Sequence, residues 1–241
     1  MEIRGASALV TGAGRGIGRA VSLALAAAGA RVTAVSRTKG EIDALVAEIE
    51  RRGGHAVAHA ADLTRREACD EAVARAVQAH GSLQVLVNNA GIGGFAPVAE
   101  TSDEAWDGIF ATNVTAPFRL TRAALPHLAR QGGEIFMISS LAGANATANL
   151  AAYSASKAAL DHFSRCLMLE VRHQGIKVTV VAPGSVATGF GGDRTDRPER
   201  EASWMLQPED VAAAVLDLLQ TRGAAHLSRV EMRPLRPPKR A

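Results

Sequence analysis

The stretch TGAGRGIG, Thr11 to Gly18, decides the fold of this chain because it joins a short apolar strand directly to a helix. SALVT (7–11) is predicted as the strand, and residues 16–28 as the helix that follows it. Glycine lets backbone N–H groups approach a ligand, and a helix N-terminus attracts an anion. The stretch therefore predicts a cradle for a pyrophosphate. The residues expected there are Gly12, Arg15, Gly16, Ile17 and Gly18.

The spacing of these glycines is G-x-x-x-G-x-G, which differs from G-x-G-x-x-G and from a loop ending in G-K-[ST]. Taken by itself, the spacing also suits a strand–helix turn that packs tightly and binds nothing. Its place directly after the first predicted strand favours a nucleotide site.

The alternation of strand and helix continues along the whole chain. Further β-branched runs are predicted as strands at 31–36, 55–61, 83–88, 134–139, 177–182 and 227–233. Helices are predicted between them at 40–52, 65–80, 102–129, 151–173 and 208–221. Strands that alternate with helices, without hairpin signals, predict a doubly wound, Rossmann-type α/β fold. Its parallel sheet of about seven strands would be covered by helices on both faces.

Local signals refine the helices. Pro117 and Pro126 lie inside the stretch 102–129, so this helix is predicted to be kinked or broken. Thr64 and Thr101 are each followed by a glutamate three residues later, a pattern typical of a capping box at a helix start.

Length and composition exclude several classes of protein. The chain has 241 residues, 47% of them hydrophobic and 21% charged, with a net charge of +3. These values predict one folded domain over 1–241 and argue against disorder and nucleic-acid binding. No apolar run is long enough to cross a bilayer, and Cys69 and Cys166 lack the spacing of metal ligands. We expect a cytoplasmic protein with no membrane, metal or nucleic-acid partner.

Two segments differ in composition from the rest of the chain. Residues 188–207 are rich in glycine and in charges of alternating sign, and they are predicted to form a lid over the substrate. The tail 234–241 is proline-rich and, together with Arg233 before it, basic. We expect this tail to be solvated; a nucleic-acid-binding arm is the alternative.

The end of the second predicted strand indicates which dinucleotide is bound. A carboxylate about 20 residues after the glycine turn normally binds the ribose 2′-hydroxyl of NAD. Here the sequence VSRT (35–38) contains no acid, and the first one is Glu41. Arg37 would instead pair with a 2′-phosphate, and Arg15 would be a second clamp. We therefore predict NADP(H) in preference to NAD(H); two plain surface arginines are the alternative.

The single tyrosine of the chain, Tyr153, precedes Lys157 by four residues in a predicted helix. This spacing places the two side chains on one helix face, within reach of each other. A free phenol has a pKa of about 10, so it is a poor base at neutral pH. Lowering that pKa by about three units takes about 4 kcal/mol of phenolate stabilisation, part of which the ammonium of Lys157 would supply. An ordinary amphipathic pair has the same spacing.

Ser140 follows the predicted strand 134–139. Ligands of open parallel sheets bind at the carboxyl ends of the strands, where the glycine turn also lies. No His–Asp pair at recognisable spacing would activate Ser140, so it is predicted to polarise a carbonyl oxygen and not to act as a nucleophile. A capped strand-to-loop transition is the alternative.

In their order and spacing, these elements resemble the short-chain dehydrogenase/reductase family, in its compact single-domain branch similar to 3-oxoacyl-carrier-protein reductases. The resemblance runs from Ala6 to about Pro234. The matching elements are TGAGRGIG (11–18), Asp62-Leu63, Asn88-Asn89-Ala90-Gly91, Asn113-Val114, Ser140, Tyr153 with Lys157, and Pro183-Gly184 with Thr188.

The resemblance implies roles for four residues. Tyr153 would be the general acid/base, and Lys157 would lower its pKa and hold the nicotinamide ribose. Ser140 would orient the substrate, and Asn113 would hold a water of the proton relay. Cofactor contacts are implied, besides the glycine turn and Arg37, for Asp62, Leu63, Asn89, Ala90, Gly91, Tyr153, Lys157, Pro183, Gly184, Val186 and Thr188.

The resemblance also implies a homodimer or homotetramer and a hydride transfer between NADP(H) and a small-molecule carbonyl or alcohol. With a short lid and small residues after Ser140, we expect a medium-sized ketone, aldehyde or 3-oxoacyl thioester. A non-catalytic dinucleotide sensor and an imine reductase on the same fold are the alternatives.

Overall fold

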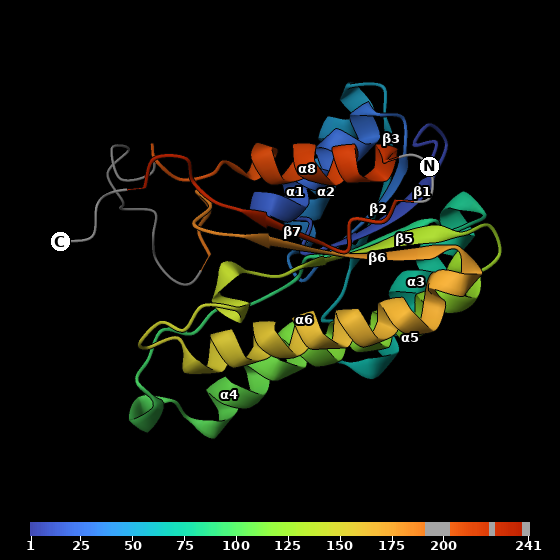
Figure 1. Cartoon of the computed structure of the whole chain (residues 1–241). Coiled ribbons are helices and arrows are strands. Elements are labelled where there is room, and N and C mark those ends of the chain that lie inside the picture. The colour runs from blue at the N-terminus through green and yellow to red at the C-terminus, as the bar shows by residue number, and fades with distance from the viewer. Residues whose placement is uncertain (191–202, 222–224, 238–241) are drawn as a thin grey trace.

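In the computed structural model, which describes residues 1–190, 203–221 and 225–237, seven parallel strands form one sheet (Figure 1). Their order in space is β3-β2-β1-β4-β5-β6-β7, so the direction of winding reverses between β1 and β4. This arrangement confirms the predicted doubly wound fold. The strands are β1 (Ser7–Thr11), β2 (Arg31–Ser36), β3 (His55–Ala60), β4 (Val85–Asn88), β5 (Gly133–Ile138), β6 (Ile176–Pro183) and β7 (Arg229–Met232).

Helices cover both faces of the sheet (Figure 1). On one face lie α1 (Gly16–Ala27), α2 (Lys39–Arg51) and α8 (Pro208–Gln220). On the other lie α3 (Arg66–His80), α4 (Asp103–Phe110), α5 (Ala116–Leu128) and α6 (Ala151–Val171). Because strand side chains alternate between faces, Val10 of β1 belongs to one apolar core and Leu9 to the other.

The predicted elements agree with the observed ones within two residues at each end, except for the stretch 102–129. There a π-helical turn, Ala111–Thr115 (η2), separates α4 from α5. Pro117 has no N–H to donate to the carbonyl of Asn113 four residues earlier, which explains a break at this point. Pro126 lies inside α5 without interrupting it.

The two predicted capping boxes are wrong. The N–H and hydroxyl of Thr64 both donate to Oδ1 of Asp62, at 3.0 and 2.9 Å, so Asp62 makes a local turn. Helix α4 is capped by Ser102, whose Oγ accepts a bond of 3.2 Å from the N–H of Ala105. In both places a neighbouring polar side chain competes successfully with the threonine.

Candidate active site

A cavity of about 1410 Å³ follows the carboxyl edge of the sheet. Among the predicted site residues, only Gly18 and Asn113 do not line it. Those that line it are Gly12, Arg15, Gly16, Ile17, Arg37, Asp62, Leu63, Asn89, Ala90, Gly91, Ser140, Tyr153, Lys157, Pro183, Gly184, Val186 and Thr188.

The glycine turn forms one end of the cavity. Gly12 and Gly16 have φ angles of +63° and +54°, a region that favours glycine. A Cβ on Gly18 would overlap the carbonyl oxygen of Gly12, so Gly18 is a packing residue behind the turn. The first N–H groups of α1 have no intrahelical partner, and the side chain of Arg15 does not cap them. This turn therefore fits a pyrophosphate group.

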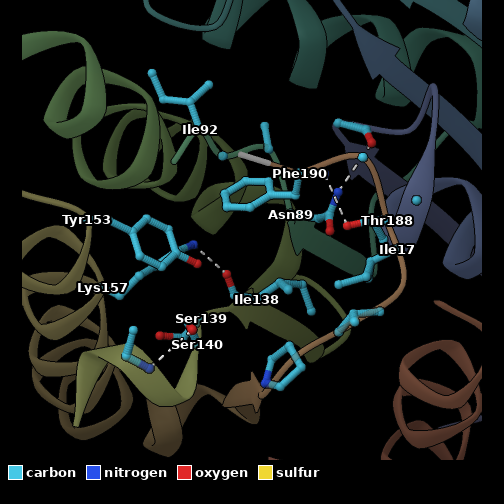
Figure 2. Close-up of a pocket in the computed structure, with 18 of the residues that line it drawn as sticks. Ile17, Asn89, Ile92, Ile138, Ser139, Ser140, Tyr153, Lys157, Thr188 and Phe190 are labelled. Carbon is cyan, nitrogen blue, oxygen red and sulfur yellow. Dashed lines mark hydrogen bonds between the residues drawn. The ribbon is translucent and has the colours of Figure 1, made fainter. Parts of the chain in front are cut away.

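Thr11 and Asn89 brace the turn against the end of β4. The Asn89 amide nitrogen donates to the carbonyl oxygens of Thr11 and Gly12, at 2.8 and 3.2 Å (Figure 2). The Thr11 hydroxyl oxygen accepts the N–H groups of Asn89 and Ala90, both at 3.0 Å. Asn89 therefore holds the shape of the cradle, and its amide nitrogen is already engaged.

The exposed side chains of Arg15 and Arg37 line the adenosine end predicted from the sequence. Asp62 lies there too, and hydrogen bonds from Thr64 lower the pKa of its carboxyl. Glu41 also lines this region, although no role was predicted for it from the sequence. The first turn of α2 brings the Glu41 carboxylate against Gly14 of the glycine turn, close to Ser36. Its position in a helix that starts right after β2 was the signal that could have identified it.

Tyr153, Lys157 and Ser140 meet in the middle of the cavity, where Figure 2 shows them beside the end of β5. Lys157 is 4% exposed, and its Nζ donates a bond of 2.9 Å to the carbonyl oxygen of Ile138. Ser140 acts on the Tyr153 hydroxyl and lowers its pKa, and the Ser140 Oγ accepts the N–H of Ala142 at 3.1 Å. These three of the four predicted catalytic side chains are thus brought together.

Burial dominates the electrostatics of this group. It raises the pKa of Tyr153, and the hydrogen bond with Ser140 opposes that rise only in part. It lowers the pKa of Lys157 to about 8, while the negative charge of Asp161 acts in the opposite direction. That Lys157 lowers the pKa of Tyr153 stays a prediction; the ammonium of Lys157 hydrogen-bonds to the carbonyl oxygen of Ile138.

Asn113 lies in η2, fully buried beside the cavity. Its Oδ1 accepts the N–H of Ile92 at 2.9 Å, and its Nδ2 donates to Ile92 O and Ser156 Oγ, at 2.9 and 3.0 Å. The side chain therefore ties the loop after β4 to α6. The water-holding role implied for Asn113 stays a prediction.

The loop after β6 closes the cavity beside the glycine turn. Gly184 donates its N–H to the carbonyl of Met232 at 2.8 Å, which joins this loop to the end of β7. The Thr188 methyl lies 3.0 Å from the point where a Cβ of Gly16 would stand. The predicted loop residues are therefore in place for a cofactor that spans the cavity.

Part of the tail contributes to the far wall of the cavity. Pro234 and Pro237, together with Arg233, line the cavity, although Arg233 and residues 235–237 are exposed, so the solvated tail stays a prediction. Because β7 pairs with β6 in parallel, it ends at the carboxyl edge and delivers the following residues there. The same topological rule that located Ser140 could have found them. Residues 238–241 lie outside the described part of the chain.

The predicted lid is described only at its two ends, since 191–202 lie outside the described residues. Phe190, Trp204 and Met205, from these two ends, line the cavity. The ring of Phe190 lies 5.7 Å from that of Tyr153, centre to centre (Figure 2). The described ends of the lid thus supply apolar contacts beside the phenol.

Metal binding and membrane spanning were considered for residues 1–190, 203–221 and 225–237. They contain no group of three or more side chains arranged to hold a metal ion. None of their helices has both the length and the apolar character that a membrane span requires.

Comparisons with known proteins point to one family. A model of the short chain dehydrogenase family matches residues 6–199. An uncharacterised oxidoreductase of Mycobacterium tuberculosis is 37% identical over 229 residues, 90% of this chain and 86% of that protein. The 3-oxoacyl-[acyl-carrier-protein] reductase of Synechocystis is 34% identical over 226 residues, 92% of each protein. The crystal structure of a metagenomic short-chain oxidoreductase in complex with NADP has a TM-score of 0.85 at 36% identity, covering 97% of this chain and 99% of that one.

Proposed function

The chain belongs to the short-chain dehydrogenase family, and on that premise we propose that it is an NADP(H)-dependent oxidoreductase interconverting a carbonyl and an alcohol. The observation that carries this proposal is the meeting of Tyr153, Lys157 and Ser140 in the cavity that begins at the glycine turn. The walls beyond them are mostly small or apolar, which suits a medium-sized ketone, aldehyde or 3-oxoacyl thioester.

In carbonyl reduction, the Tyr153 hydroxyl gives its proton to the substrate oxygen, and Ser140 hydrogen-bonds the same oxygen. The raised pKa of Tyr153 keeps the hydroxyl protonated beforehand. The Lys157 ammonium stabilises the phenolate that remains. Bound nicotinamide supplies the hydride, or takes it up in the reverse direction.

Two cations support NADP(H) as the cofactor. Arg15 and Arg37 both line the adenosine end, where a guanidinium pairs well with a 2′-phosphate. Glu41 opposes this preference by its charge, but its side chain is exposed, so water and salt screen that charge. Arg37→Gln should raise the KM for NADPH about 10-fold and leave the KM for NADH unchanged. Arg51→Gln, at the end of α2 and outside the cavity wall, is the matched control; a native preference for NADH would contradict the assignment.

The reaction class is tested by following NADPH oxidation with a panel of ketones, aldehydes, imines and acyl thioesters. Turnover of carbonyl compounds is the expected result. Reduction of imines alone would support an imine reductase. Tight NADPH binding without turnover of any compound would support a non-catalytic sensor, although the complete set of Tyr153, Lys157 and Ser140 speaks against one.

We also propose that the chain forms a homodimer or homotetramer through α5 and α6. Both helices carry large apolar side chains that are exposed in a single chain, Phe118 and Leu169. Light scattering should give two or four times the chain mass of 25.1 kDa. A Phe118→Glu, Leu169→Glu variant should be monomeric, whereas a monomeric native protein would refute the assembly.

A further inference from the structure

A line of charged side chains connects the edge strand β7 to the helix that carries Tyr153 and Lys157. Asp161 follows Lys157 by one turn of α6 and is 6% exposed. Its Oδ2 accepts a hydrogen bond of 2.6 Å from Nη1 of Arg229, on β7. The other side of the same guanidinium binds Glu231 at 3.3 Å. No role is predicted for these three residues from the sequence.

The Asp161 carboxylate is buried, and only one of its two oxygens is bound by Arg229. Its Oδ1 is buried and has no hydrogen-bond partner among the described residues. The short helix Leu141–Gly143 (η3) covers it, since a Cβ on Gly143 would lie 3.0 Å from Asp161 Oδ2 and 3.1 Å from the carbonyl carbon of Lys157. Burying a carboxylate in this way is costly, so a nearby cation is needed to compensate.

Arg229 is one such cation, and Lys157, which is itself buried four residues earlier on the same helix, is a second. On α6 it is flanked by Tyr153 and Asp161, and β7 contributes Arg229 and Glu231 behind Asp161. The groups that face Lys157 from the other elements are uncharged: the Asn113 amide, Gly91, the Ile138 carbonyl, Ser139 and Ser140. Within the described part of the chain, Asp161 is therefore the carboxylate that acts on Lys157.

We propose that Asp161, held in place by Arg229, is a positioning residue that keeps Lys157 protonated while Tyr153 ionises. The inference rests on the proposed function, because it assumes that the Tyr153 phenolate forms during turnover. It extends the site to β7, an element at the edge of the sheet that holds no reacting group.

The physical reason is a competition for one proton. When the buried pair Tyr153 and Lys157 loses a single proton, either the phenol or the ammonium can release it. A carboxylate next to the lysine favours the state in which the ammonium stays charged, so the phenol ionises. Without that carboxylate, burial favours a neutral amine beside a neutral phenol. The direct ion pair of Asp161 is with Arg229, while Nζ of Lys157 donates to the carbonyl oxygen of Ile138.

The test uses the fact that Tyr153 is the only tyrosine, so phenolate absorbance reports on this one group. The full chain is titrated with saturating NADP⁺ as the wild type, Asp161→Asn and Glu231→Gln. In Asp161→Asn the phenolate should appear about one pH unit higher than in the wild type. The acid limb of the pH profile for alcohol oxidation should move by the same amount. Glu231→Gln, which removes the other carboxylate bound to Arg229, should leave the phenol titration unchanged.

A double variant protects the test against a folding defect. Asp161→Asn leaves Arg229 without its buried partner, whereas Asp161→Asn with Arg229→Gln removes both charges. The double variant should show the same displaced titration. Phenol titrations that match the wild type in both variants would overturn the proposal. A chain that reduces no carbonyl yet shows the displacement would refute the proposed function and leave the link between Asp161 and Lys157 standing.

Discussion

The two edges of the sheet each bury an ionisable side chain beside strand β5, and they differ in what surrounds it. At the carboxyl edge, Lys157 binds the last carbonyl of β5 and faces a cavity of about 1410 Å³. At the amino edge, Glu134 is 3% exposed near the start of the same strand, with Thr179 at 3.4 Å. The cavity found at that edge, beside Gln84, measures about 60 Å³.

Burial pushes both groups toward their neutral forms. It lowers the pKa of Lys157 to about 8 and raises the pKa of Glu134 to about 7, although Lys177 opposes the rise at Glu134. At the carboxyl edge, Lys157 has a phenol as a neighbour and faces a large cavity. At the amino edge the neighbours of Glu134 are Thr179 and Lys177. A perturbed pKa therefore indicates chemistry only where a ligand can reach the group.

The largest expected effect is at the carboxyl edge. Tyr153→Phe removes the proton donor and keeps the ring beside Phe190, so kcat should fall at least about 1000-fold. NADPH binding, followed by its fluorescence, should change little because the glycine turn and Arg37 are untouched. A fully active Tyr153→Phe protein would contradict the catalytic role of Tyr153. The carboxyl edge would then not differ from the amino edge in this respect.

The amino edge should respond in stability and not in activity. The folded state holds the Glu134 proton up to about pH 7, whereas the unfolded chain releases it near its ordinary pKa of 4.5. The folded state thus binds more protons between these values, so stability falls as pH rises from about 4.5 to 7. Above this window the buried charge costs about 3 kcal/mol. Glu134→Gln should recover most of that free energy at pH 8, with kcat unchanged.

Urea unfolding at several pH values measures this effect. Glu50→Gln, an exposed carboxylate at the end of α2, is the control and should retain the wild-type pH dependence. If Glu134→Gln proves less stable than the wild type at pH 8, the Glu134 carboxylate makes a favourable interaction and the interpretation is wrong.

A substitution in the glycine turn, at the carboxyl edge, should have an intermediate effect. A Cβ at Gly18 would overlap the Gly12 carbonyl oxygen, so Gly18→Ala should cost about 2 kcal/mol and weaken NADPH binding. Gly40→Ala is the matched control because a Cβ there meets nothing within 4 Å, in α2. It should be neutral or stabilise the protein by up to about 1 kcal/mol. Equal effects of the two substitutions would show that the turn is not tightly packed.

What the sequence predicted well depends on local patterns. Strands such as β1 are buried on both faces, so their apolar runs mark them clearly. The spacing of Tyr153 and Lys157 and the position of Ser140 at a strand end are also local. Contacts between distant segments were missed, as with Glu41 over the glycine turn and Arg229 on Asp161. Such pairs depend on how β7 and α2 pack, which no single stretch of sequence reveals.

The smallest expected effect concerns the tail, part of which lines the cavity. A solvated tail would make its removal silent, but Pro234 lines the cavity, and its Cδ lies 3.3 Å from the position of a Cβ on Gly184. Ending the chain after Arg233 should raise the KM for the carbonyl substrate about 3- to 10-fold, equivalent to about 1 kcal/mol of lost apolar contact. The KM for NADPH should stay the same. Leu235→Ala is the control, since this side chain is almost fully exposed and should not matter. An unchanged KM after truncation would show that the tail does not contact the substrate. The substrate-binding wall of the cavity would then consist of the loops after β5 and β6.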